Sequence, residues 1–122
     1  MPSTRFVILH HCHADGEHWD LMIEQDSALA TWQLAHNPLA GDPRAISAVR
    51  LDDHRKAYLE YEGPLSGDRG HVTRIERGRC RILQDQPALL RFHLDGEHLV
   101  GTFELATNDD KRGTFRPVPD SP

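Results

Sequence analysis

His-Trp-Asp-Leu-Met-Ile-Glu, residues 18–24, alternates polar and apolar side chains in the manner of a β-strand with one buried face. The odd-numbered members form an apolar row that suits a hydrophobic core. His18, Asp20 and Met22 then point to the opposite face. On a strand, His18 and Asp20 lie about 7 Å apart at Cα, which lets both side chains reach one metal ion.

The residues just before this stretch form the densest group of candidate ligands in the chain. Four of the nine histidines fall within nine positions. If residues 14–17 form a turn, the chain folds back and one of His11, Cys12 or His13 lies near His18. Two histidines and a carboxylate commonly hold a divalent metal with positions open for water and substrate. A structural or solvated role is the alternative, because a His-x-Asp pattern also occurs by chance.

Short alternating, β-branched or aromatic segments recur along the whole sequence, and no segment shows a sustained helical period. The expected strands are residues 5–11, 18–25, 28–35, 45–51, 57–62, 71–77, 79–84, 88–94, 98–105 and 114–118. Asp95-Gly96 is a strong hairpin signal, and another hairpin is expected around Gly78. The pattern predicts a compact, all-β antiparallel sandwich or barrel over residues 1–118, followed by a disordered tail at 119–122.

Length and composition are those of one domain. The chain has 122 residues and a net charge of −5, which argues against nucleic-acid binding through bulk charge but not against a metal-dependent phosphate site. Cys12 and Cys80 form no disulfide framework, which favours a reducing cytoplasm. The apolar run at residues 6–9 is too short for a signal peptide or a membrane span. We therefore expect a cytoplasmic protein without a membrane partner.

A second group of polar residues lies near the middle of the chain. Asp52, Asp53 and His54 end one expected strand, and Tyr58 comes four residues later. His54 and Tyr58 are donors suited to a phosphate. On a straight strand they would lie about 13 Å apart, so a bend or helical turn across residues 55–57 is required. The ordinary alternative is an acidic turn with the tyrosine packed on the sheet.

Basic residues are biased towards arginine, with twelve Arg and two Lys. Arginine forms forked contacts with phosphate that lysine does not. The residues Arg74, Arg77, Arg79 and Arg81 are expected on a basic hairpin that contacts a nucleic-acid backbone. A solvated charged face is the alternative.

Taken in order, these segments resemble the 3′-phosphoesterase domain of bacterial DNA ligase D, the end-processing module of bacterial non-homologous end joining. The resemblance runs from about Arg5 to Val118. It rests on residues 6–11, 18–24, 31–32, 52–54, 58, 61–64, 67–70 and 92–101.

The resemblance implies a β-barrel with a metal and phosphate site in a concave face. It implies a hydrolase that uses manganese, with Zn²⁺ or Co²⁺ as alternatives. The implied substrate is the 3′ end of DNA or RNA-capped DNA, from which a terminal ribonucleoside and then a 3′-phosphate are removed. Implied partners are a DNA ligase or other end-joining proteins.

The family's metal ligands are two histidines and an aspartate. His18 and Asp20 match two of them directly. The first family histidine lies six residues before the second, and here that position is Cys12. His11 is the expected replacement if the turn carries one extra residue, and His13 is the second choice.

The family's phosphate-contacting histidine and tyrosine match His54 and Tyr58, and the acidic residue two before that histidine matches Asp52. By resemblance these three are the expected catalytic residues. Where the family carries an arginine two residues after the metal-binding aspartate, this chain has Met22, which has no donor. Reduced activity is therefore expected, unless Arg50 or Arg44 reaches the phosphate from the neighbouring strand.

Two other functions remain open from the sequence. A catalytically weak or inactive module that binds metal and DNA ends is favoured by Met22. A cupin-like metal enzyme is suggested by His11-x-His13-x3-Glu17, although the glycines that flank that motif are missing.

Overall fold

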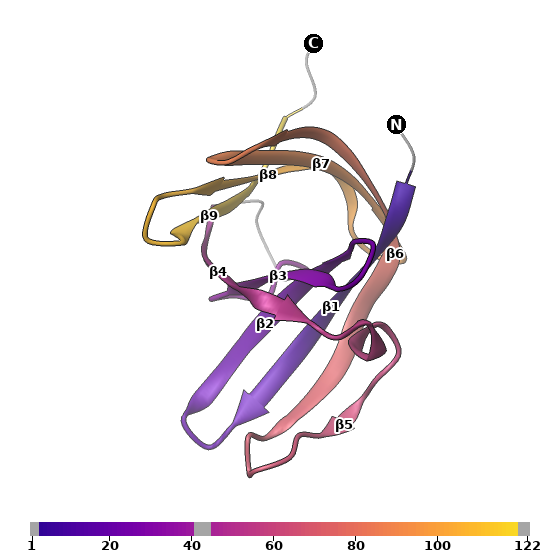
Figure 1. Ribbon diagram of the computed structural model, residues 1–122, viewed down its shortest axis with the longest axis vertical. Helices are drawn as coiled ribbons and strands as arrows, with labels where there is room; N and C mark the ends of the chain where they lie inside the picture. Colours follow the sequence, from indigo (N-terminus) through magenta and orange to yellow (C-terminus); the bar gives the residue numbers. More distant parts are fainter. Residues whose placement is uncertain (1–2, 41–44, 120–122) are drawn as a thin grey trace.

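The computed structural model describes residues 3–40 and 45–119, and Figure 1 shows it as a ribbon. These residues form β1 (Ser3–His13), β2 (Gly16–Glu24), β3 (Leu29–Leu34), β4 (Ile46–His54), the 3-10 helix η1 (Lys56–Leu59), β5 (Gly63–Pro64), β6 (His71–Gln86), β7 (Leu89–Gly96), β8 (Val100–Thr107) and β9 (Arg112–Pro117). Across the described ranges, no helix has the length and apolar character needed to cross a bilayer. Of the tail expected at 119–122, residues 120–122 lie outside the described residues.

Eight of the described strands close into an antiparallel barrel. The order around the ring is β1-β2-β3-β4-β9-β8-β7-β6, and β6 pairs back onto β1. The short strand β5 adds to the start of β6. In Figure 1 the long strands β1, β2 and β6 run together towards the bottom of the view, away from both termini. The ring confirms the all-β antiparallel prediction and selects the barrel over the sandwich.

Alternation along β1 and β2 builds two apolar clusters, one on each face of the barrel wall. The larger cluster fills the barrel and includes Phe6, Ile8 and Leu21. The smaller one, which we call the outer cluster, consists of Val7, Leu9, Met22, Leu29, Leu59 and Val72. Because Leu59 belongs to η1, this helix covers part of the outer face of the sheet.

Strand β6 corrects the hairpin expected around Gly78. The strand runs through 16 residues and pairs with both β1 and β7. Gly78 lies within it, opposite Phe6 and Gly96. A Cβ at this position would lie 2.1 Å from the carbonyl oxygen of Asp95. The glycine therefore permits a close approach between strands and does not form a turn.

The strand expected at residues 57–62 is also wrong, because the chain coils into η1 at its start. Leu59 is buried in the outer cluster, and the adjacent Tyr58 packs against the same cluster. Neighbouring residues of a strand point to opposite faces, so only a coiled backbone lets both side chains reach it.

Ion pairs join η1 and β1 to the end of β2. Glu24 Oε2 lies 2.7 Å from Arg5 Nη2 and 3.4 Å from Lys56 Nζ. Hydrogen bonding from Arg5 lowers the pKa of Glu24 to about 2. The carboxylate therefore stays charged throughout the neutral range, and the contact that holds η1 beside β2 persists.

Glu76 is a buried carboxylate inside the barrel, 1% exposed. It accepts hydrogen bonds from the backbone N–H groups of Arg77, Glu97, His98 and Leu99. Three of these donors belong to the turn between β7 and β8. A single side chain on β6 thus fixes the conformation of that turn.

Candidate metal centre

The β1–β2 hairpin sets the geometry of the candidate metal centre. Its turn is Ala14-Asp15, two residues long where four were expected. The resulting register pairs His11 directly with His18. Paired residues of antiparallel strands share a face, and Asp20 lies two positions further along the same face.

The side chains of three residues converge on this face. His11 Nδ1 lies 3.0 Å from His18 Nε2, which lies 3.3 Å from Asp20 Oδ1. His11 Nδ1 and Asp20 Oδ2 are 4.0 Å apart. Ligands bound about 2.1 Å from one ion lie roughly 3.0–3.5 Å from each other. The three residues, which we call the triad, therefore fit one divalent ion with small side-chain adjustments.

The surroundings of the triad also suit a cation. Asp20 is 4% exposed, and its Oδ1 accepts no hydrogen bond from any described residue. A buried carboxylate oxygen that accepts no hydrogen bond is unfavourable, and a bound cation would satisfy it. His11 Nε2 lies 2.7 Å from the carbonyl oxygen of Arg69. An N–H donated there leaves the lone pair of Nδ1 facing the other ligands.

The Arg69 carbonyl is a part of the site that sequence reasoning missed. It belongs to the loop at residues 66–70, most of which was noted in the sequence only as part of the family resemblance. Gly70 has φ of +87°, and a Cβ there would lie 1.8 Å from the carbonyl oxygen of Cys12. The loop therefore runs directly against β1. Its glycines and its place in the family resemblance were the available signals, since a backbone carbonyl leaves no trace in side-chain patterns.

The other candidates for the third ligand lie differently. Cys12 faces the opposite side of the hairpin, and Glu17 lies with it there. His13 stands at the end of the triad face, with its ring centroid 5.3 Å from that of His11 and 5.6 Å from that of His18. Because Glu17 lies on the opposite face of the hairpin from His11 and His13, the cupin-like ligand set does not assemble, and that interpretation is wrong.

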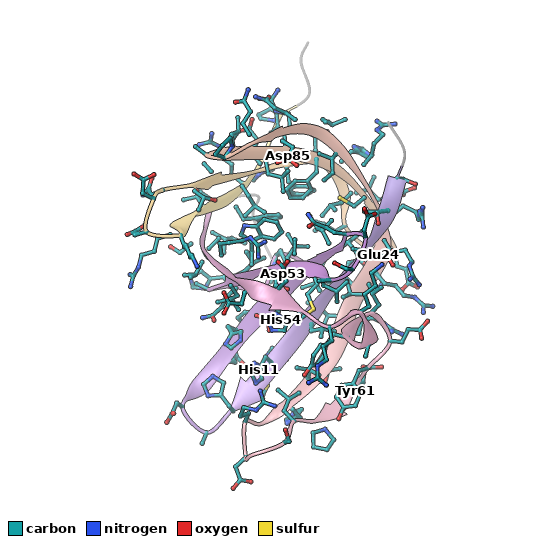
Figure 2. All side chains as sticks on the ribbon, viewed as in Figure 1. His11, Glu24, Asp53, His54, Tyr61 and Asp85 are labelled. Carbon is teal, nitrogen blue, oxygen red and sulfur yellow. The ribbon has the colours of Figure 1, made fainter. Side chains whose placement is uncertain are left out.

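His54 and Tyr58 lie on the same face as the triad, at the far end of the outer cluster. His54 pairs with Leu29 of that cluster. The turn of η1 brings the two rings edge to face, with centroids 5.7 Å apart. The carbonyl oxygen of Asp52 lies 2.9 Å from His54 Nδ1, which leaves Nε2 as the nitrogen available to a ligand. In Figure 2, His11 and His54 both lie in the lower half of the view.

Met22 occupies the position between these two groups. It lies two residues beyond Asp20 on β2, pairs with Val7, and is 1% exposed within the outer cluster. The outer cluster therefore separates the triad from His54 and Tyr58 along the strand.

Arg50 lies on the other face of the barrel wall. It pairs with Trp32, and its guanidinium stacks over the indole at 4.8 Å. Its Nη2 donates to Asp53 at 2.9 Å. The structure does not bring Arg50 to the triad, and Arg44 lies outside the described residues.

Four arginines line the outer face of β6, on one strand and not on two arms of a hairpin. They pair in register with β1. They are Arg74, Arg77, Arg79 and Arg81, which we call the arginine row. Arg74 donates to the Leu59 carbonyl, and Arg77 pairs with Glu97 at 3.0 Å. The row begins two residues after Val72, which pairs with His11, so it extends along the sheet from the triad.

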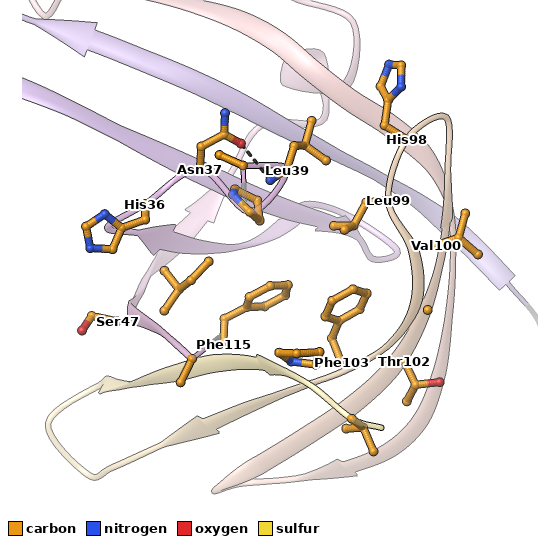
Figure 3. A pocket seen from close by; sticks show the side chains of 17 residues that line it. His36, Asn37, Leu39, Ser47, His98, Leu99, Val100, Thr102, Phe103 and Phe115 are labelled. Atoms are coloured by element: carbon orange, nitrogen blue, oxygen red, sulfur yellow. Dashed lines mark hydrogen bonds between the residues drawn. The ribbon is translucent and has the colours of Figure 1, made fainter. Parts of the chain in front are cut away.

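A large cavity lies elsewhere in the molecule. It has a volume of about 1060 Å³, and its walls include His36, Leu99, Phe103 and Phe115 (Figure 3). None of the triad residues lines it. The candidate chemistry is therefore on the outer face of the barrel wall and not in this cavity.

Comparisons with known proteins place most of the sequence within one family. A sequence model of the family described as "DNA Ligase D 3′-phosphoesterase domain" matches residues 9–107. The "Multifunctional non-homologous end joining protein LigD" of Pseudomonas aeruginosa is 29% identical over 109 residues, which cover 83% of this chain. The aligned region spans 13% of that relative's length.

Proposed function

Because the chain belongs to the DNA ligase D 3′-phosphoesterase domain family, we propose that it processes nucleic-acid 3′ ends as a metal-dependent phosphoesterase. The proposed reaction removes a 3′-phosphate, or first a 3′-terminal ribonucleoside, and leaves a 3′-hydroxyl on DNA or RNA-capped DNA. The observation that carries the proposal is the triad, where two imidazole nitrogens face a buried carboxylate oxygen that accepts no hydrogen bond within the described chain. Mn²⁺ is the proposed ion, with Zn²⁺ or Co²⁺ as substitutes.

His11, His18 and Asp20 would hold the ion. When bound, a divalent ion polarises a phosphoryl oxygen and lowers the pKa of a coordinated water. The Arg69 carbonyl keeps His11 in the orientation that binding needs. Leu9, which pairs with Asp20, excludes water from one side of the carboxylate and so strengthens its interaction with charge.

His54 and Tyr58 would contact the phosphate. Since the Asp52 carbonyl accepts from Nδ1, a protonated His54 presents Nε2–H to an anion as a charge-assisted donor. The Tyr58 hydroxyl adds a neutral donor. Because the outer cluster lies between them and the triad, these donors serve a substrate that lies across Met22.

The arginine row would contact the nucleic-acid backbone beyond the reacting end. Arg77, Arg79 and Arg81 are exposed and alternate along β6, about 6.6 Å from one to the next at Cα. Arginine at this spacing favours successive phosphate contacts. A DNA ligase or another end-joining protein is the proposed partner for the processed end.

The test is phosphate release from a DNA duplex that carries a 3′-phosphate. We expect release with Mn²⁺ and none after treatment with a chelator, with recovery when Mn²⁺ is returned. A duplex with a 5′-phosphate is the matched control and should release none. Equal release with and without the chelator would contradict a metal-dependent phosphoesterase.

The second candidate is a module that binds metal and DNA ends without turnover. Met22 favours it, because the position that carries a donor in the family lies within an apolar cluster here. Duplex binding with metal present, combined with no phosphate release, would support this function.

Met22→Arg separates the two candidates. A charge-assisted hydrogen bond contributes about 1.5–3 kcal/mol, so a phosphoesterase that lacks this donor should gain at most about 10- to 100-fold in single-turnover release. Burial of a guanidinium in the outer cluster should at the same time lower the urea midpoint of unfolding. Both quantities are measured on the same preparation.

Met22→Leu is the matched control, since it keeps an apolar side chain of similar volume and adds no donor. It should leave release and the urea midpoint close to those of wild type. If wild type releases phosphate readily and Met22→Arg does not change the rate, another group already supplies the donor that Met22 lacks. No release from either protein would favour the binding module.

A further inference from the structure

The opposite face of the β1–β2 hairpin carries a second group of possible ligands. One nitrogen of His10, Sγ of Cys12 and one carboxylate oxygen of Glu17 all lie within 4.8 Å of one another. Cys12 pairs with Glu17 across the hairpin, and His10 lies two residues from Cys12. All three side chains therefore point away from the triad.

The distances suit a single ion. Cys12 Sγ lies 3.4 Å from His10 Nε2, which lies 2.9 Å from Glu17 Oε2. Zinc bonds of about 2.3 Å to sulfur and about 2.0–2.1 Å to nitrogen or oxygen place tetrahedral ligands roughly 3.3–3.6 Å apart. The observed distances are within a few tenths of an ångström of that range. The His10 ring is also positioned by Trp19, which stacks on it at 4.9 Å and 13°.

Strand β6 offers a fourth ligand. His71 pairs with Cys12 in the β1–β6 register, so the two side chains share a face. Cross-strand neighbours of this kind have Cβ atoms about 4.5–5.5 Å apart, within reach of one ion after a rotation of the exposed imidazole. A row across the adjacent strands β2, β1 and β6 is thus formed by Glu17, Cys12 and His71, and His10 lies beside this row.

We propose that His10, Cys12 and Glu17, completed by His71, form a second metal site that takes Zn²⁺ or another thiolate-binding divalent ion. Binding converts the Cys12 thiol to a thiolate and releases its proton. Thiolate favours zinc and disfavours manganese, whereas imidazole with carboxylate accepts both, so Mn²⁺ discriminates between the two faces of the hairpin. With four protein ligands the second site has no open position, and its role is to join the hairpin to β6.

The experiment is a Co²⁺ titration of the metal-free full chain, followed by absorbance and elemental analysis. A Co²⁺–thiolate bond gives a charge-transfer band in the near ultraviolet, which imidazole and carboxylate ligands do not give. Wild type should show this band, and Cys12→Ser should lose both the band and one bound equivalent. The double variant His18→Ala/Asp20→Ala should keep the band and lose the other equivalent.

Cys80→Ala is the matched thiol control. Cys80 is fully buried, and burial raises its pKa to about 12, so this thiol stays protonated and the variant should keep the band. A titration of wild type without a charge-transfer band would overturn the proposal. So would a band that persists in Cys12→Ser.

A second measurement needs no substitution. Bound Zn²⁺ should slow the reaction of wild-type Cys12 with a thiol-specific disulfide reagent at least about tenfold, because the metal holds the thiolate. An unchanged rate in saturating Zn²⁺ would show that Cys12 and its neighbours are only a hydrogen-bonded surface group.

Discussion

His18→Ala and Asp20→Ala are each expected to weaken Mn²⁺ binding more than about 100-fold. The reason is that removing a group that merely hydrogen-bonds to a metal ligand already weakens metal binding about 10- to 100-fold. Phosphate release from a 3′-phosphate duplex should be lost with the metal. Binding is measured from the electron paramagnetic resonance signal of free Mn²⁺. Mn²⁺ is the right probe because the thiolate-containing face of the hairpin disfavours it.

His98→Ala is the matched control for the loss of an imidazole. His98 is exposed on the turn between β7 and β8 and belongs to neither ligand group. It should bind Mn²⁺ as wild type does. Unchanged Mn²⁺ affinity in both triad variants would contradict the proposal that the triad binds the metal ion.

Unfolding of the variants without metal supplies an independent check. Asp20→Ala removes a buried carboxylate oxygen that accepts no hydrogen bond from the described chain. The metal-free variant should therefore lose little stability relative to metal-free wild type, since a buried carboxylate oxygen that accepts no hydrogen bond opposes folding and offsets the attraction of His18 and His11. Loss of Mn²⁺ binding in a variant of undiminished stability cannot be attributed to misfolding.

Glu76→Gln is expected to lower the free energy of unfolding by about 2–6 kcal/mol. Glutamine keeps the volume but replaces one carboxylate oxygen by an NH₂ group, so about two backbone N–H groups lose their acceptor, at roughly 1–3 kcal/mol each. Typical domains have a total stability of about 5–15 kcal/mol, so the effect is a large fraction of it. Urea unfolding followed by circular dichroism measures the change.

Glu97→Gln is the control for Glu76→Gln. Glu97 makes an ion pair with Arg77, and both side chains are more than half exposed. Exposed pairs contribute about 0–1 kcal/mol, so this variant should remain close to wild type. If the two variants had equal stability, the backbone hydrogen bonds to Glu76 would not stabilise the fold as proposed.

The alternation of residues 18–24 was sufficient to predict the face that His18 and Asp20 share. It was not sufficient to choose the third ligand, because the register depends on the length of the turn. A two-residue turn pairs His11 with His18, whereas a change of one residue would bring Cys12 to the same face. The sequence alone therefore left the choice open, and the hairpin geometry favours His11.

Other features depended on contacts between distant segments. A glycine at position 78 fits either a turn or a strand that lies very close to its neighbour, and the local sequence is the same in both cases. Only the position of the Asp95 backbone shows that Gly78 lies in a strand. The burial of Met22 depends on Leu59, which reaches the outer cluster from η1. The Arg69 carbonyl reaches His11 from a loop 58 residues away in sequence. Each of these requires the closed barrel.

Closure of the ring by β1 and β6 has a consequence for folding kinetics. That pairing joins residues as distant as Ser3 and Arg81, whereas the triad lies on one hairpin whose strands are joined by two residues. Contacts of long sequence separation form slowly, and local hairpins form early. We therefore expect the three triad side chains to come together before the barrel closes. The Arg69 carbonyl, the packing of η1 on the sheet and the arginine row are expected to reach their final places only in the last, slow step. Refolding should recover the ligand face of the hairpin first and the surface proposed to receive nucleic acid last.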